Sequence, residues 1–254
     1  MVGNLLLRGM LVGVVAALFA FGFARVFGEP HIDRAIALEE LVAAAEQAAR
    51  GQPVGEEEPE LVSRSTQAGM GLLTGLVVYG AAAGGLFALV FAYAFGRMGR
   101  LGPRATAGLL ALGGFVALVA VPFLKYPATP PAVGSPETIG ARTELFFVMM
   151  LVSLLAAVAC ISLAQRLWAS RGGWNASIIA AAAFVVVVGI ANYALPTVNE
   201  VPEGFPADLL WSFRLASLGL HAVLWTVIGL AFGALAERSL ADYRPAAALR
   251  AANR

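Results

Sequence analysis

Apolar runs of about twenty residues recur along the whole chain, and they restrict its fold more than any other feature. A helix needs about twenty apolar residues to cross the hydrocarbon core of a bilayer. Within lipid, every backbone polar group must be hydrogen-bonded inside the protein, so runs of this length form helices. The apolar residues stand in blocks and do not alternate as in strands. The sequence therefore predicts an all-α integral membrane protein embedded in a lipid bilayer.

The scarcity of charge supports this class. Only 13% of the 254 residues are charged, 59% are hydrophobic, and the mean hydropathy is +0.80. A soluble domain carries roughly a quarter of charged residues. The net charge of +1 gives no indication of a nucleic-acid partner, and the single cysteine excludes an intrachain disulfide.

The runs predict a bundle of six transmembrane helices in one membrane domain, residues 1–254. The predicted spans are 5–27, 69–95, 105–124, 145–167, 176–197 and 215–236. The first run follows Arg8 and has small residues near its end, which also fits a cleaved signal peptide and would leave five spans. We favour retention, because the positive region is thin and the apolar run continues to Phe27.

The distribution of basic residues indicates the orientation, because Lys and Arg collect in cytoplasmic loops. The connections after the second and fourth spans and the C-terminal tail are basic. The three longer connections, 28–68, 125–144 and 198–214, are acidic or nearly balanced. The two kinds alternate along the chain. Both termini are therefore predicted to be cytoplasmic, and the three longer loops to lie outside.

An arginine precedes each even-numbered span, at Arg64, Arg142 and Arg214, and each odd-numbered span ends near a proline. One interpretation is a repeat of three helical hairpins, and chance similarity between membrane hairpins is the other. An arginine at the membrane surface also has a structural role, in which it snorkels to headgroups or caps a loop carboxylate. We favour the structural role for Arg64 and Arg142.

Small residues spaced four apart predict close contacts between helices. Such pairs occur at Gly9/Gly13, Gly71/Gly75, Gly80/Gly84 and Gly229/Gly233. The second span has small residues on nearly every side of its helix, so we expect it at the centre of the bundle.

The first outer loop combines a helix start with candidate metal ligands. The segment "EPHIDRAIALEELVAAAEQAAR" predicts a short amphipathic helix, followed by a flexible acidic piece, "GQPVGEEEPE". Glu29, His31 and Asp33 alternate at its start and offer the oxygen and nitrogen ligands that divalent cobalt, nickel or manganese accepts. In the alternative interpretation, these groups cap the helix and pair with Arg25 and Arg34.

The third outer loop and the helix after it supply the other candidate metal ligands. Glu200 and Glu203 offer oxygen ligands, and His221 follows on the same helix face as Arg214 and Trp225. A histidine about two turns inside the membrane should face the bundle interior or a water-filled cavity. We therefore place Glu200, Glu203 and His221 on a candidate ion path. A hydrogen bond from His221 that bridges two helices is the alternative.

Catalytic motifs are absent from the sequence. It contains no P-loop, HExxH or GxSxG pattern and no His/Cys cluster. Almost no carboxylate lies in the middle of a span, which argues against a self-contained proton-coupled carrier. We predict that the chain is not an enzyme, has no catalytic residue and holds no permanently bound cofactor.

Four loop segments together resemble the CbtA family, predicted cobalt transporter subunits of bacteria. They are "FARVFGEPHIDRAIALEE", "ELVSRSTQAGMGLLTG", "VPFLKYPATPPAVGSPETIGART" and "NEVPEGFPADLLWSFRLASL". The resemblance covers nearly the whole chain and implies an inner-membrane protein that transports Co²⁺ and is tied to cobalamin metabolism. It also implies a small membrane partner, CbtB, with a histidine-rich metal-binding segment.

Two functions follow from the residues and the resemblance. The first is a membrane subunit of an uptake system for cobalt or another divalent cation, acting with the small partner. The second is a non-transporting scaffold that assembles other subunits through its rigid proline loops and glycine faces. Cobalt and nickel accept the same ligands, so the residues do not separate these two ions.

Overall fold

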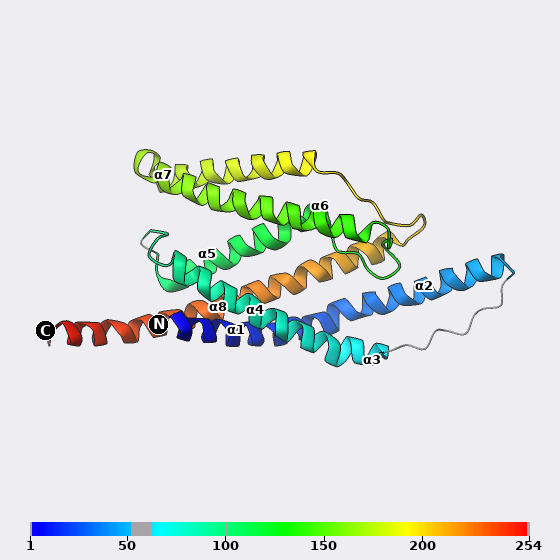
Figure 1. Ribbon diagram of the computed structural model, residues 1–254, viewed down its shortest axis with the longest axis horizontal. Coiled ribbons are helices and arrows are strands. Elements are labelled where there is room, and N and C mark those ends of the chain that lie inside the picture. Colours follow the sequence, from blue (N-terminus) through cyan, green and yellow to red (C-terminus); the bar gives the residue numbers. More distant parts are fainter. Residues whose placement is uncertain (1, 52–61, 100, 253–254) are drawn as a thin grey trace. The chain divides into compact units, whose positions relative to one another are not determined.

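The computed structural model describes residues 2–51, 62–99 and 101–252, which form helices joined by short connections (Figure 1). No strand occurs within these ranges. Five helical stretches are long and apolar enough to cross a membrane: Gly3–Ala49, Arg64–Ala94, Pro103–Lys125, Ile139–Ala194 and Ala207–Leu240. The chain is thus an all-helical, multi-pass membrane protein, as the apolar runs predict.

The described residues fall into two compact units. Unit 1 draws on Met1–Phe21, Leu72–Phe115 and His221–Arg254, and unit 2 on Gly22–Gly71 and Val116–Leu220. Each unit is built from segments that are far apart in the sequence, so its helices are joined by long-range packing.

Unit 1 contains four helical segments. They are most of α1 (Val2–Phe23), α4 (Leu72–Ala94), α5 (Pro103–Phe115) and the later part of α8 (Ala207–Ala252). Aromatic side chains connect α4 with α8, since Phe232 lies edge-on to Phe87 and Phe91 at centroid distances of 5.4 and 5.1 Å. Phe91 and Phe232 are fully buried and form the centre of this unit.

Helices α1 and α4 approach so closely that no side chain fits between them. A Cβ atom built on Gly13 would overlap the carbonyl oxygen of Gly80, and one on Gly84 would lie 2.9 Å from the Cα of Gly13. Gly9 faces Gly84 in the same way. The predicted contacts of Gly9/Gly13 and Gly80/Gly84 are therefore confirmed, and α4 packs against α1 here and against α8 through the aromatic side chains.

A second glycine pair joins α8 to α5. A Cβ on Gly229 would lie 2.6 Å from the Cβ of Ala111, and one on Gly233 would lie 3.2 Å from that of Ala107. This pair is also confirmed as a helix contact. The pair Gly71/Gly75 is not, because a Cβ on Gly75 would meet no described atom within 4 Å and one on Gly71 would meet only Thr66 of its own turn.

Unit 2 contains the remaining elements. They are α2 (Glu29–Ala49), α3 (Arg64–Thr66), α6 (Val121–Lys125), α7 (Ile139–Ala194), the start of α8, and five-residue π-helical segments at Ala24–Gly28, Gln67–Gly71 and Val116–Ala120. The predicted short amphipathic helix corresponds to α2, which continues directly from α1 through the first π-helical segment. The predicted flexible acidic piece lies outside the described residues, apart from Gly51.

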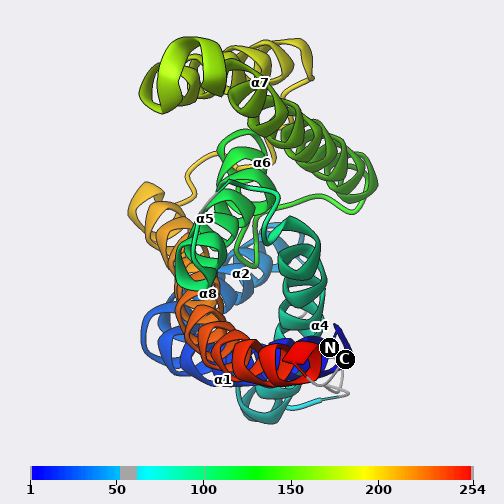
Figure 2. The same cartoon turned by 90° about the vertical axis from the view of Figure 1, so that its left-hand side faces the viewer.

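Helix α7 is a hairpin whose two arms pack against each other. Gly172 has φ 73° and ψ 157°, a backbone conformation that favours glycine, and the helix doubles back there (Figure 1). Met149 of the first arm is fully buried in a cluster with Val121 and Tyr126, and Phe184 and Val188 of the second arm pack against this cluster. Figure 2 shows the same hairpin with its turn toward the viewer.

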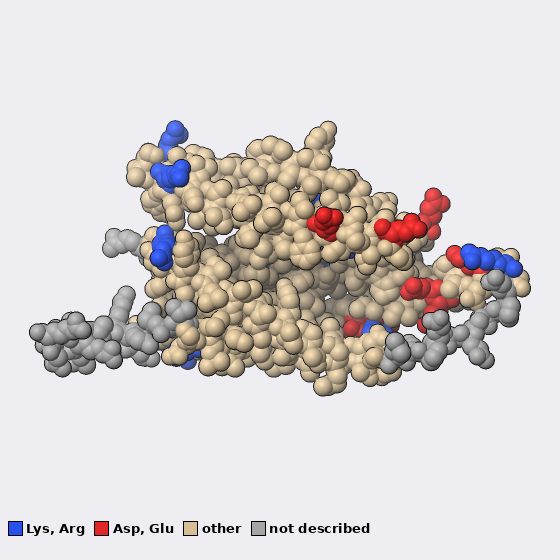
Figure 3. Space-filling model, in the orientation of Figure 1, with Lys and Arg blue, Asp and Glu red and all other residues tan. Residues whose placement is uncertain are grey.

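The acidic side chains of unit 2 lie away from the turn of α7. Figure 3 shows Lys and Arg side chains over that turn, and Asp and Glu side chains, with further Lys or Arg side chains among them, toward the opposite end of the unit. The basic side chains near the turn are Arg166 and Arg171. This separation agrees with the basic and acidic loops that the sequence assigns to opposite sides of the membrane, and the orientation itself stays a prediction.

Candidate functional site

Two candidate metal ligands of α2 lie around one arginine. The buried carboxylate of Glu29 pairs with the guanidinium of Arg64, and Arg64 Nε donates to Asp33 Oδ1 at 3.1 Å. Glu29 and Asp33 are four residues apart on a helix, so they share a face and one guanidinium reaches both. The structural role predicted for Arg64, a cap on loop carboxylates, is confirmed.

His31 does not join this pair, because α2 begins at Glu29 and its helical rotation carries residue 31 away from the face of residues 29 and 33. The imidazole Nδ1 of His31 is buried and has no hydrogen-bond partner among the described residues. Nowhere in the described ranges do three His, Cys, Asp or Glu residues form a group that could hold a metal ion.

The arginines next to these ligands in sequence have other partners. Arg25 donates to the carbonyl oxygen of Ala68 at 3.4 Å, and Arg34 pairs with Asp208 at 3.4 Å across the exposed surface. The alternative interpretation, in which the first-loop carboxylates pair with Arg25 and Arg34, was therefore wrong about the partner. The partner of these carboxylates is Arg64, which is more than thirty residues away in sequence.

Glu200 lies at the centre of a second arginine network. Arg142, in the first turn of α7, donates from Nη1 to Glu200 Oε2 at 2.7 Å and to Thr129 Oγ1 at 2.8 Å, and from Nη2 to the carbonyl of Pro127 at 3.2 Å. The hydroxyl of Thr138 donates to the other carboxylate oxygen, Oε1. The capping role predicted for Arg142 is thus also confirmed.

This network keeps Glu200 ionised although its side chain is only 3% exposed. The hydrogen bond from Thr138 and the ion pair with Arg142 hold the pKa of the Glu200 carboxyl below its ordinary value, while burial acts in the opposite direction. Both carboxylate oxygens accept hydrogen bonds, and the ion pair with Arg142 competes with any incoming metal ion. Glu200 therefore connects the third loop to the start of α7.

Glu203 lies elsewhere, on a cavity of about 410 Å³ in unit 2. One wall is α2, with Glu39 and Glu46 two turns apart on one face, and the other walls are the loop segments 132–134 and 202–205. The sequence analysis missed Glu39 and Glu46. Their seven-residue spacing, which places them on one helical face, is the signal that could have identified them.

His221 faces the interior of unit 1, as predicted for a histidine within a span. Its ring lies edge-on to Tyr79 of α4 with centroids 6.3 Å apart, and its Nδ1 is buried without a hydrogen-bond partner in the described ranges. The indole Nε1 of Trp225, one turn later on α8, is also buried without a hydrogen-bond partner in the described ranges. The bridging hydrogen bond proposed as an alternative for His221 is not made by Nδ1.

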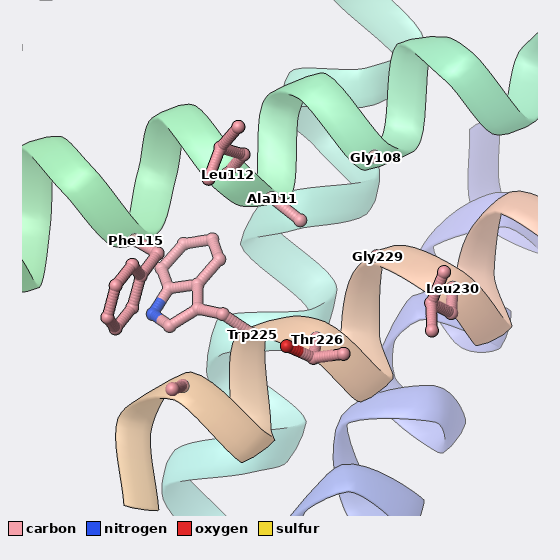
Figure 4. Close-up of a pocket in the computed structure, with 9 residues that line it drawn as sticks. Gly108, Ala111, Leu112, Phe115, Trp225, Thr226, Gly229 and Leu230 are labelled. Carbon is pink, nitrogen blue, oxygen red and sulfur yellow. The ribbon is translucent and has the colours of Figure 1, made fainter. Parts of the chain in front are cut away.

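Trp225 lines an apolar cavity of about 330 Å³ between α8 and α5 (Figure 4). Its indole ring lies against the backbone of α5, where a Cβ on Gly114 would overlap the ring. Thr226 is the one polar neighbour in the lining besides the indole itself. The cavity therefore offers little to a charged ion.

Comparison with known proteins identifies a family. The model of a family described as a probable cobalt transporter subunit, CbtA, matches residues 2–237, nearly the whole chain. No curated protein matches the chain. No solved structure matches it either.

Proposed function

The chain belongs to the CbtA family of probable cobalt transporter subunits, and from this premise we propose that it is the membrane subunit of a system that takes up cobalt or a related divalent cation. The family match over residues 2–237 is the observation that carries the proposal. The system resides in the bacterial inner membrane and includes a small partner of the CbtB type, whose histidine-rich segment captures the ion.

The topology proposed for this subunit has six spans with both termini in the cytoplasm. The left-handed backbone of Gly172 and the packing of the two arms of α7 support two crossings by that helix. Arg166 and Arg171 beside the turn support its location in the cytoplasm, because basic residues collect there.

The carboxylates of Glu39, Glu46 and Glu203 collect the cation at the outer surface. A cavity lined by one sign of charge raises the local concentration of the opposite ion. Within the spans, His221 offers an unpartnered ring nitrogen as a ligand. The other candidate carboxylates, those of Glu29, Asp33 and Glu200, each pair with an arginine, which competes with the ion for them.

We expect the combined substitution Glu39→Gln, Glu46→Gln, Glu203→Gln to lower cobalt accumulation about tenfold at a low external concentration, because the attracting charge is lost. The loss should shrink as cobalt approaches saturation. The measurement is accumulation of radioactive cobalt in cells that also express the small partner. Glu40→Gln is the matched control, since Glu40 follows on the same helix and does not line the cavity. Unchanged uptake by the triple variant would remove the cavity from the ion path.

A scaffold is the second candidate, and one observation favours it. Three of the candidate ligands, Glu29, Asp33 and Glu200, are paired with two arginines, an arrangement that suits a clamp between segments. A scaffold should co-purify with partner subunits, and deletion of its gene should leave cellular cobalt unchanged.

A further inference from the structure

The three arginines that precede the even-numbered spans differ in one respect. Arg64 and Arg142 each pair with carboxylates, whereas no acidic side chain in the described ranges pairs with Arg214. The one protein acceptor of Arg214 there is the carbonyl oxygen of Ala128, which is 3.4 Å from Nε. The acidic residue nearest to Arg214 in sequence, Asp208, pairs with Arg34.

Arg214 and Arg142 line one small cavity of about 30 Å³, together with Glu200. Two arginines and one glutamate are among the residues that line this space, which leaves one positive charge uncompensated. Glu200 does not balance it, because it carries one negative charge, which is paired with Arg142. A partly buried charge without a partner is unfavourable, so this cavity is suited to a negative ligand.

We propose that the cavity binds one small monovalent anion of the size of chloride, held by the terminal N–H groups of Arg214. Its volume is enough for one or two particles the size of water and too small for phosphate or a larger polyatomic anion. Asn199, also in the lining, accepts the N–H of Val201 through its side-chain oxygen, which leaves its amide group as a further donor. The bound anion neutralises the excess charge beside the Arg142–Glu200 pair.

The proposal is tested on the full chain purified in detergent. Sodium gluconate is replaced stepwise by sodium chloride at constant ionic strength, and the midpoint of thermal unfolding is measured. Because a ligand that binds the folded state stabilises it, we expect the midpoint to rise by about 2–4 °C at a few times the Kd. Bromide should replace chloride, and gluconate, which is too large to enter, should not.

Two variants assign the effect to Arg214. Arg214→Gln should abolish the difference between chloride and gluconate, whereas Arg34→Gln, which alters an exposed arginine, should retain it. The proposal is overturned if the unmodified chain responds equally to chloride and gluconate, or if Arg214→Gln responds to chloride as the unmodified chain does. The comparison of chloride with gluconate on the unmodified chain tests anion binding even if Arg214→Gln does not fold. Neither result depends on cobalt transport.

Discussion

Arg142→Ala is expected to destabilise the chain by about 3–5 kcal/mol, because it leaves a buried carboxylate without its counter-charge. The carboxylate is that of Glu200, whose side chain is 3% exposed and would keep only the hydrogen bond from Thr138. The same substitution removes the contacts to Thr129 and Pro127, which hold the loop between α6 and α7. The measurement is the midpoint of thermal unfolding in detergent, with the amount of protein in the membrane as a second readout.

Two companion variants show whether the loss comes from the buried pair. The double variant Arg142→Met, Glu200→Leu should recover most of the stability, because a buried ion pair replaced by apolar side chains is often neutral. Arg34→Ala is the matched control, since its ion pair with Asp208 is exposed and such pairs contribute about 0–1 kcal/mol. Equal losses from Arg142→Ala and Arg34→Ala would contradict this account of Glu200.

Gly84→Leu should have the second largest effect, because the new side chain would have to occupy space that the backbone of α1 fills. Its Cβ would lie 2.9 Å from the Cα and N atoms of Gly13, and backbone atoms cannot move aside unless the helices separate. Extra methylene groups in a packed interior typically cost about 1–3 kcal/mol, and we expect the upper end of that range here. The measurement is the unfolding midpoint, together with the fraction of monodisperse protein after extraction.

Gly75→Leu is the control for this experiment. Gly75 lies on the same helix, α4, and a Cβ there meets no described atom within 4 Å. This variant should keep the stability of the unmodified chain. If Gly75→Leu and Gly84→Leu are equally harmful, the effect belongs to leucine in α4 and not to the contact with α1.

The fold class could be predicted from the sequence because a chain in lipid must satisfy its backbone hydrogen bonds internally, which restricts apolar runs of this length to helices. A run such as that at 69–95 is too long and too apolar for anything but a membrane helix. The contacts of Gly13 and Gly84 were predictable for a similar reason, since only small residues allow two backbones to come so close. The local conformation of Gly172, by contrast, has no signal beyond the glycine itself.

The candidate site was less predictable, because its geometry depends on partners that are distant in sequence. The alternation of Glu29, His31 and Asp33 in the sequence resembles a cluster of metal ligands. In the structure, the helix places His31 on a different face from the two carboxylates. The counter-ion is Arg64, 35 residues after Glu29, and sequence proximity suggested Arg25 and Arg34. Glu200 and Arg142 are 58 residues apart, so only the packing of the loops brings them together.

The cavity lined by Glu39, Glu46 and Glu203 was also only partly predictable from the sequence. The spacing of Glu39 and Glu46 places them on one face of α2, which the sequence contains. That Glu203 lies opposite them depends on the path of the third loop, which no local pattern determines.

The most direct test of the transport proposal is the accumulation of radioactive cobalt in cells that express this chain, with and without its small partner, against a vector control. We expect accumulation above the control when both chains are present, and a smaller increase when the partner is absent. Protein in the membrane is confirmed in each case by immunoblot. No accumulation with both chains present in the membrane would contradict transport and favour the scaffold.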